Sequence, residues 1–263
     1  MEALLRLGAF MAILLLMLGW EFFRPMRQAH QSRRQRWPVN LGLAAFNMLV
    51  MRFSIGSAAW LAAQWAAEQH LGLFNSLSIP VELSIPGSLL LLDLAIYAQH
   101  VAAHRWPWFW RLHQVHHSDL DFDTTTAVRF HPLEILLSML YKVTLVILLG
   151  PTPDTVMAFE IILNGCALFN HGNVSLTPRV ERVLRYLLIT PDLHRIHHSA
   201  RPEETDSNYG FSLSCWDRLF KTYRPHARQA QTRMTIGLNG FRTPAELGFF
   251  KLLAMPFRAV RNR

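Results

Sequence analysis

The feature that most constrains this chain is a series of apolar blocks, each long enough to cross a lipid bilayer. They run over residues 3–20, 39–67, 86–104, 132–150 and 154–170. About 20 apolar residues span the hydrocarbon core as a helix, and a spanning helix satisfies its own backbone polar groups. The sequence therefore predicts an all-α, polytopic membrane protein with about four to five transmembrane helices. Arg6, inside the first block, is expected to extend toward the interface.

The distribution of basic residues predicts how these helices are oriented. The net charge is +8, but the arginines lie between and after the apolar blocks, so we expect no nucleic-acid partner. Five arginines fall within 24–36, three within 105–131 and fifteen Lys and Arg within 172–263, whereas 68–85 has none. Cytoplasmic loops are rich in Lys and Arg. The three basic segments are therefore predicted to be cytoplasmic, and 68–85 and the 151–153 turn to lie outside.

We divide the chain into three regions. Residues 1–85 are predicted to form an N-terminal transmembrane region with an exterior loop, 86–223 a catalytic domain, and 224–263 a basic tail. The last twenty residues are expected to form a basic amphipathic helix on the membrane surface. Cys166 and Cys215 lack CxxC spacing and indicate neither a disulfide framework nor a thiolate metal site.

Eight of the thirteen histidines fall into three motifs: an HxxxH pair that closes the third block and two HxxHH triplets. They are His100, His104, His113, His116, His117, His194, His197 and His198. Residues three or four apart share a helix face, so the first histidine of a triplet neighbours both later ones. The last two diverge and can point at different ions. The motifs thus predict a histidine-rich helical cap that holds two metals on the cytoplasmic face. Imidazole suits zinc, copper, iron or nickel.

Other residues near the motifs have simpler interpretations. The lone histidines His30, His70 and His226 are interpreted as surface or hydrogen-bonding residues. Asp93, two turns before the HxxxH pair, is either functional, as intramembrane acids often are, or hydrogen-bonded to a neighbouring helix.

Two clusters of residues flank the first triplet. Three tryptophans are interpreted as an interfacial aromatic belt, with a substrate channel as the minority interpretation; they are Trp106, Trp108 and Trp110. Three acids follow the triplet and are either solvated or hydrogen-bonded to metal-binding imidazoles; they are Asp119, Asp121 and Asp123. We favour Asp121 as a supporting residue of the site.

Several segments together resemble the fatty acid hydroxylase and sterol desaturase superfamily. They are HVAAH, WRLHQVHH, TAVRFHPLE, FNHGN, LHRIHH, NYG and WDRLF, which cover roughly residues 90–223 in matching order and spacing. The resemblance implies two irons bound through eight or more histidines. It also implies that dioxygen and two electrons are used to hydroxylate or desaturate a C–H bond of a lipid such as a sterol or fatty acyl chain.

The same resemblance assigns roles to individual residues. It makes the eight motif histidines metal ligands, adds His171 as a ninth, and gives Asn208 and Tyr209 of the NYG segment a supporting role. We expect His131, which precedes a proline that restricts its backbone, to hydrogen-bond a ligand or an acid. No other side chain is expected to be catalytic. Lys221 departs from the glycine found there in many relatives, so the turn that follows is expected to differ.

The resemblance also bears on cofactors and partners. Two Fe ions are expected, with zinc as a substitute in purified material. No cytochrome b-like haem segment is evident, so a separate electron-donor protein is expected, with the basic tail as its docking surface. A membrane zinc hydrolase and a metal transporter are the alternatives. The first usually has three ligands, often in HExxH, and the second often has repeated halves; the sequence shows neither. The lipid, its carbon and the oligomeric state stay open.

Overall fold

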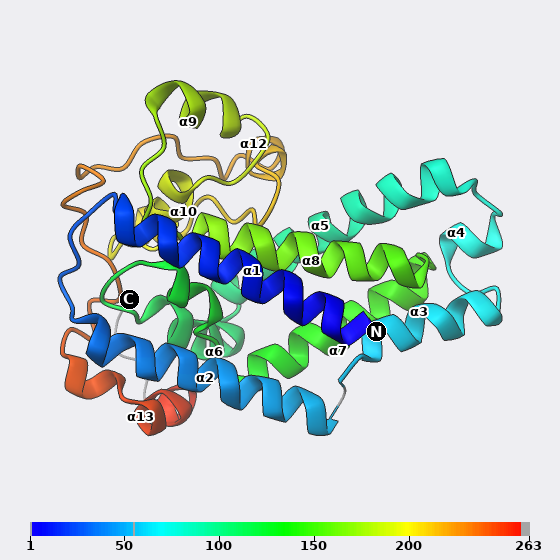
Figure 1. Ribbon diagram of the computed structural model, residues 1–263, viewed down its shortest axis with the longest axis horizontal. Coiled ribbons are helices and arrows are strands. Elements are labelled where there is room, and N and C mark those ends of the chain that lie inside the picture. The colour runs from blue at the N-terminus through cyan, green and yellow to red at the C-terminus, as the bar shows by residue number, and fades with distance from the viewer. Residues whose placement is uncertain (1, 55, 259–263) are drawn as a thin grey trace.

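The computed structural model describes residues 2–54 and 56–258, whose regular structure is helical, with isolated β-bridges and no strands (Figure 1). The long helices are α1 (Glu2–Phe23), α2 (Arg33–Ser54), α5 (Val81–Arg105), α7 (Pro132–Leu149) and α8 (Pro153–Asn170). The shorter helices are α3 (Ala58–Glu68), α4 (Leu73–Ser76), α6 (Pro107–His117), α9 (Pro178–Leu184), α10 (Pro191–His197), α11 (Pro202–Thr205), α12 (Cys215–Leu219) and α13 (Phe249–Ala254), with the 3-10 turns η1 (Thr124–Val128), η2 (Pro244–Leu247) and η3 (Met255–Phe257). The prediction of an all-α fold is confirmed.

Within the described residues, four segments are long and apolar enough to cross a membrane. They are Glu2–Phe23, Arg33–Ser76, Val81–Arg105 and Pro132–Leu149. The expected fifth span forms the 18-residue helix α8, but it carries Asp154, Glu160 and two asparagines and is not one of the four. A polytopic membrane protein with four candidate spans agrees with the expectation of four to five.

Two boundaries differ from the sequence prediction. The block expected over 39–67 is two helices, α2 and α3, because the chain turns at Gly56, whose φ is +28°. The segment 68–85, expected to be a loop, contains α4 and the first turn of α5, so Pro86 lies inside a helix instead of at its start. Membrane helices tolerate proline when neighbouring groups satisfy the freed carbonyl.

The segments that connect the long helices lie at two opposite ends of the molecule. The chain between α5 and α7 and the chain after α8 build a cap at one end, whereas α4 lies at the far end (Figure 1). At that far end Gly72 and Gly150 touch closely: a Cβ on Gly72 would lie 2.4 Å from the Gly150 nitrogen. Both have positive φ, +93° and +69°, which glycine adopts at little cost. The predicted exterior segment 68–85 thus contacts the C-terminal end of α7, just before the 151–153 turn, at the end opposite the cap.

Arg6 does not extend to the interface as expected. Its guanidinium pairs with Glu160 of α8 and, at 2.6 Å, with Glu2, and it donates to Ser57 at 3.0 Å. Glu160 also accepts from Lys142 of α7 at 2.7 Å. Charges in an apolar environment are stable only when paired, so this cluster ties α1, α7 and α8 together.

The last twenty residues do not form one amphipathic helix over their described part. Gly248 and Pro256 confine the α-helix to the six residues of α13, and residues 259–263 lie outside the described residues. Leu252 and Met255 are buried in a hydrophobic cluster with Leu43 of α2. The segment is therefore part of the cap, because its apolar side chains pack against protein.

Candidate metal centre

Four elements deliver the nine predicted histidines to one place. The last turns of α5 and α6 carry two of the motifs, α10 with its C-cap His198 carries the third, and His171 caps the C-terminus of α8. Helix α6 begins with Pro107, and α10 begins after Thr190, whose hydroxyl accepts from the Leu193 N–H at 3.4 Å. Proline at the first position and threonine at the N-cap are favourable helix starts, so local sequence determines where each triplet begins.

The histidines form two adjacent sets, which we call the five-histidine set and the four-histidine set. In each set, one ligand atom from every residue lies within 4.8 Å of all the others. The five-histidine set is His100, His104, His113, His117 and His197, and the four-histidine set is His116, His171, His194 and His198. The last two histidines of each triplet fall into different sets, which is the divergence that the HxxHH spacing predicts.

The chemistry of these nitrogens fits metal ions. Several buried Nε2 atoms have no hydrogen-bond partner; they belong to His100, His113, His117, His197 and His198. In the four-histidine set, Nε2 of His171 lies 3.1 Å from Nε2 of both His116 and His194. Buried polar atoms without partners are costly, and imidazole is a preferred ligand of iron, zinc and copper. The residues present can therefore hold two ions.

Burial also keeps these imidazoles in the neutral form that binds metals. Desolvation lowers the pKa of His171 to about 4 and that of His197 to about 3. It holds the pKa of His116, His117 and His198 well below the ordinary value of 6.5. A neutral imidazole carries a free lone pair for a metal, so the nitrogens are ready to coordinate at neutral pH.

Ser207 and the NYG segment that follows it support the five-histidine set through their backbone. Nδ1–H of His100 donates to the Tyr209 carbonyl at 2.6 Å, and Nδ1–H of His197 donates to the Ser207 carbonyl at 2.8 Å. Asn208 lies between these carbonyls with φ +52°, and its side-chain amide donates to the Leu193 carbonyl at 3.0 Å. Such bonds select the tautomer that leaves Nε2 for the metal.

Glu134 is the supporting residue that sequence reasoning missed. Its carboxylate accepts from Nδ1–H of His113 at 2.6 Å, and both side chains are almost fully buried. A carboxylate in this place orients the imidazole and raises its basicity. The signal was available, since an acid in the first turn of a predicted span is a functional candidate.

His131 differs from the expectation. Its Nδ1 accepts from the Leu133 N–H at 3.2 Å as the N-cap of α7, and its Nε2–H donates to the Leu253 carbonyl at 3.1 Å. These two partners are neither a histidine of the sets nor an acid. The side chain instead joins the start of α7 to the C-terminal segment, because the proline that follows places it at the helix end.

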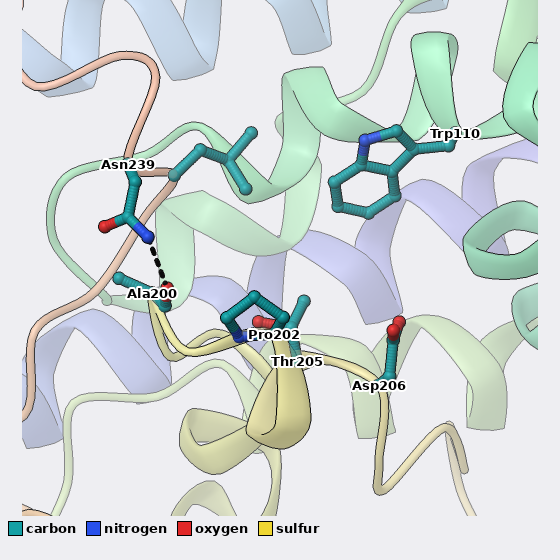
Figure 2. Close-up of a pocket in the computed structure, with 7 residues that line it drawn as sticks. Trp110, Ala200, Pro202, Thr205, Asp206 and Asn239 are labelled. Carbon is teal, nitrogen blue, oxygen red and sulfur yellow. Dashed lines mark hydrogen bonds between the residues drawn. The ribbon is translucent and has the colours of Figure 1, made fainter. Parts of the chain in front are cut away.

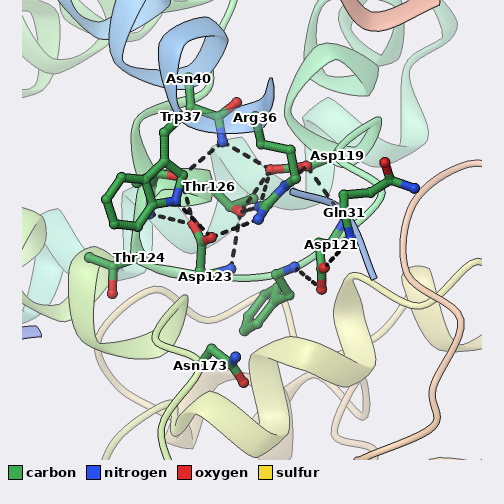
Figure 3. Close-up of polar contacts among 12 residues, drawn as sticks. Gln31, Arg36, Trp37, Asn40, Asp119, Asp121, Asp123, Thr124, Thr126 and Asn173 are labelled. Carbon is green, nitrogen blue, oxygen red and sulfur yellow. Dashed lines mark hydrogen bonds and ion pairs between the residues drawn. The ribbon is translucent and has the colours of Figure 1, made fainter. Parts of the chain in front are cut away.

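The three acids after the first triplet are neither solvated nor bonded to imidazoles (Figure 3). Arg36 of α2 pairs with Asp119 at 2.7 Å and with Asp123 at 2.6 Å, and all three side chains are buried. Asp121 accepts from the backbone N–H of His30 at 2.6 Å and of Gln31 at 3.1 Å. The acids therefore hold the arginine-rich linker against the cap, a pairing of segments far apart in sequence.

The charge of Arg36 also determines the ionisation of its partner. Burial alone would raise the pKa of Asp119, but the Arg36 guanidinium holds that pKa well below its usual range. Asp119 is thus ionised in the folded protein at every physiological pH.

The three tryptophans differ in exposure, and Asp93 has a hydrogen-bond partner in the cap. Trp106 and Trp108 are exposed, whereas Trp110 is buried, with its ring centroid 5.1 Å from that of His104. Asp93 accepts from the indole N–H of Trp216 at 2.8 Å. That bond joins α5 to α12 of the cap and not to another long helix.

These features define an all-helical membrane protein with a buried histidine site that could hold two metal ions. The sequence profile of the fatty acid hydroxylase family matches residues 85–222, and the chain belongs to that family.

The chain is similar in sequence to three curated proteins of this kind. The chain is 30% identical to ornithine lipid hydroxylase OlsE of Rhizobium tropici over 178 residues, 68% of this chain and 51% of that protein. It is 32% identical to alkylglycerol monooxygenase of Xenopus tropicalis over 152 residues, 57% and 32% of the two chains. It is 24% identical to cholesterol 25-hydroxylase of Rattus norvegicus over 202 residues, which are 75% of this chain and 65% of that protein. The chain thus spans about half of the first relative and about a third of the second. No solved structure matches it.

Proposed function

We propose that this chain is a membrane-bound di-iron oxygenase that uses dioxygen and external electrons to hydroxylate a C–H bond of a lipid. The observation that carries the proposal is the division of nine buried imidazoles into two adjacent sets. The names of the relatives describe hydroxylation or monooxygenation of an ornithine lipid, an alkylglycerol or cholesterol. These names support a lipid substrate and favour hydroxylation over desaturation, which uses the same metals.

The nine histidines are the proposed ligands, with one ion in each set. Bound there, two irons supply the activation of dioxygen that C–H oxidation requires. The protein holds them in a dry, aromatic shell. Phe130 stacks on His116 with 4.4 Å between ring centroids, and Phe211 lies 5.2 Å from His100. These rings exclude water from the reacting centre, and the backbone carbonyls of Tyr209 and Ser207 keep the imidazoles of His100 and His197 in place.

The rival functions fit this geometry less well. A catalytic zinc site has three protein ligands and an open position, whereas here nine imidazoles converge in two sets. A transporter site lies near the bilayer midplane, whereas His104 lies at the end of α5 and His171 at the end of α8. Both sets sit where the long helices meet the cap.

The decisive experiment measures metal and product together. Protein purified from cells grown with iron is expected to hold two irons per chain, and zinc is expected to occupy the same positions under zinc-rich purification. Cells with and without the gene are compared by lipid extraction and mass spectrometry, with oxygen consumption measured in membranes. One metal or none in folded protein, or identical lipid profiles, contradicts the proposal.

We also propose that the cap and the C-terminus face the cytoplasm, and that residues 86–223 form the catalytic domain. The surplus of Lys and Arg in the cap segments supports this sidedness. The test introduces a cysteine at exposed Ser76 of α4, at the end opposite the cap, in a chain without its native cysteines. A membrane-impermeant thiol reagent should label it only from outside. Labelling from the cytoplasmic side alone refutes the topology.

A further inference from the structure

One side of the cap exposes large apolar side chains to its surroundings. They come from α9, the turn after it and α12, and they are Val180, Val183, Tyr186, Leu187, Leu219 and Phe220. Val183, Leu187 and Leu219 are 69%, 63% and 65% exposed. Figure 1 shows α9 and α12 at the cap end of the molecule, to the side of the long helices α1 and α8. We call this surface the α9–α12 patch.

Hydrogen bonds join the two parts of the patch into one surface. The carbonyl of Arg185, at the end of α9, accepts from the Ser214 hydroxyl and from Nη2–H of Arg218, both at 2.8 Å. The Ser214 N–H donates to the Leu187 carbonyl at 3.0 Å. The Arg218 guanidinium also lies 5.2 Å from the ring centroid of Tyr186. The exposed side chains are therefore held together by the fold.

The exposed charges of residues 175–188 and 214–223 are all positive. Four basic side chains are exposed there: Arg179, Arg182, Arg218 and Lys221. The two acids of these segments are buried. Glu181 pairs with Arg185 at 2.7 Å, and Asp217 accepts two backbone N–H groups at 2.8 Å. On α9 the two arginines stand next to Val180 and Val183, and apolar residues flanked by cations are typical of helices that lie in a membrane interface.

The contacts between α12 and α5 indicate the depth of the patch. Phe220 stacks on Tyr97 of α5 with 5.4 Å between ring centroids, and Nε1–H of Trp216 donates to Asp93 at 2.8 Å. Helix α5 has 25 residues, so it is about 38 Å long and extends at most about 8 Å past a hydrocarbon core of about 30 Å. Tyr97 lies about 12 Å before Arg105, the last residue of α5. Phe220 therefore lies at the depth of the bilayer and not above it.

We propose that the α9–α12 patch lies in the headgroup layer on the cap side of the membrane and binds anionic phospholipid. The apolar side chains insert below the phosphates, and the four exposed cations lie beside them. Interfacial elements bury their apolar face about 5–10 Å into this layer, and each Lys or Arg near an anionic surface strengthens binding about fivefold. The sequence suggested this role for the last twenty residues, but Leu252 and Met255 of that segment pack against protein.

The first test measures the depth of the patch with a nitroxide spin label. A single cysteine replaces Val183, Leu187 or Leu219 in a chain without its native cysteines. The labelled protein is placed in phosphatidylglycerol nanodiscs wide enough for two chains. Collisions of the label with oxygen, which concentrates in the bilayer, are compared with collisions with a water-soluble nickel chelate.

Two further labels provide the references. Leu16→Cys, at a position of α1 that is 68% exposed, is the lipid reference. Asn239→Cys is the water reference: Asn239 is an exposed cap residue outside the patch, on the wall of a cleft that Trp110 of α6 and Pro202 of α11 also line (Figure 2).

The patch labels should behave like the lipid reference. They should collide with oxygen more than with the nickel chelate and report a depth of about 5–10 Å below the phosphates. Patch labels that meet the chelate as often as the Asn239 label does overturn the proposal. Patch labels that meet neither reagent and broaden each other's spectra mean that a second copy of the chain covers the patch, which also overturns it.

The second test measures the choice of lipid. Pyrene-labelled phosphatidylglycerol or phosphatidylcholine is titrated into the protein in detergent, and energy transfer from tryptophan reports binding. Arg179→Glu with Arg182→Glu should weaken phosphatidylglycerol binding about tenfold or more and keep phosphatidylcholine binding within about twofold. If this variant does not fold, Arg179→Gln with Arg182→Gln should give a smaller loss in the same assay.

The matched control is Arg228→Glu with Arg233→Glu, which makes the same change of net charge at two exposed positions outside the patch. It should leave the affinity for both lipids unchanged. An equal loss in the control means that net charge alone attracts the lipid, and it overturns the proposal. No loss in the patch variant overturns it as well.

Discussion

Replacing Glu134 by glutamine removes one negative charge from one side of the site and leaves its shape intact. The carboxylate accepts the Nδ1–H of His113 at 2.6 Å, with the two side chains only 6% and 3% exposed. His113 belongs to the five-histidine set and not to the four-histidine set. Glu134→Gln should therefore weaken the binding of one ion per chain and spare the other.

The magnitude follows from the geometry. Removing a carboxylate that supports a metal-bound imidazole costs about 10–100-fold in affinity, which is about 1.4–2.8 kcal/mol. The glutamine oxygen can still accept the hydrogen bond, so the loss comes from the missing charge. We therefore expect an affinity decrease near the lower end of this range, about tenfold.

The assay is a chelator-competition titration that resolves two metal affinities per chain. The matched control is Glu204→Gln, which changes an equally buried acid of the cap whose carboxylate accepts the Arg228 N–H at 2.6 Å. The control should leave both affinities unchanged. If Glu134→Gln weakens both ions equally, or does not differ from the control, the assignment of Glu134 to one ion is refuted.

Three further outcomes are expected. Arg36→Met should lower the free energy of unfolding by about 3–5 kcal/mol, because Asp119 and Asp123 lose their buried ion-pair partner. Arg34→Met, at an exposed position, should change it by less than about 0.5 kcal/mol; denaturation in detergent measures both. His171→Ala should abolish metal binding in the four-histidine set while His131→Ala keeps both ions, and metal analysis showing the reverse would exchange the two roles. Burial lowers the pKa of His171 to about 4, so below pH of about 6.5 the unfolded chain binds a proton that the folded chain excludes. The metal-free protein should therefore lose stability as pH falls from 6.5 towards 4, and a flat denaturant midpoint over that range would contradict this.

Much of the architecture could be read from local sequence. Apolar blocks of bilayer length predicted the long helices. The surplus of Lys and Arg predicted that the segments which the structure places in the cap would lie on one side of the membrane. The spacing of each triplet predicted that His116 and His117 would separate into different sets, as they do. These predictions succeed because helix geometry relates residues that are close in the chain.

Predictions that depended on distant partners were the weaker ones. The sequence could not show that Asp119 would face Arg36, 83 residues earlier. Neither alternative predicted for this acid, a solvated carboxylate or a contact with an imidazole, is what the structure shows. His131 was expected to bond a ligand or an acid, but its partner is a carbonyl of the C-terminal segment. Arg6 was expected to extend to the interface, but its guanidinium pairs with Glu160 of α8.

The sequence by itself determined the class of this protein: membrane-spanning helices and clustered imidazoles that could hold two metal ions. Only the tertiary structure decided which acid supports His113, which segments the aspartates hold, and that Trp110 is buried against His104. The reason is physical. Periodicity and spacing act within a helix turn or two, whereas a buried charge or hydrogen-bond donor takes whichever partner the fold brings within reach.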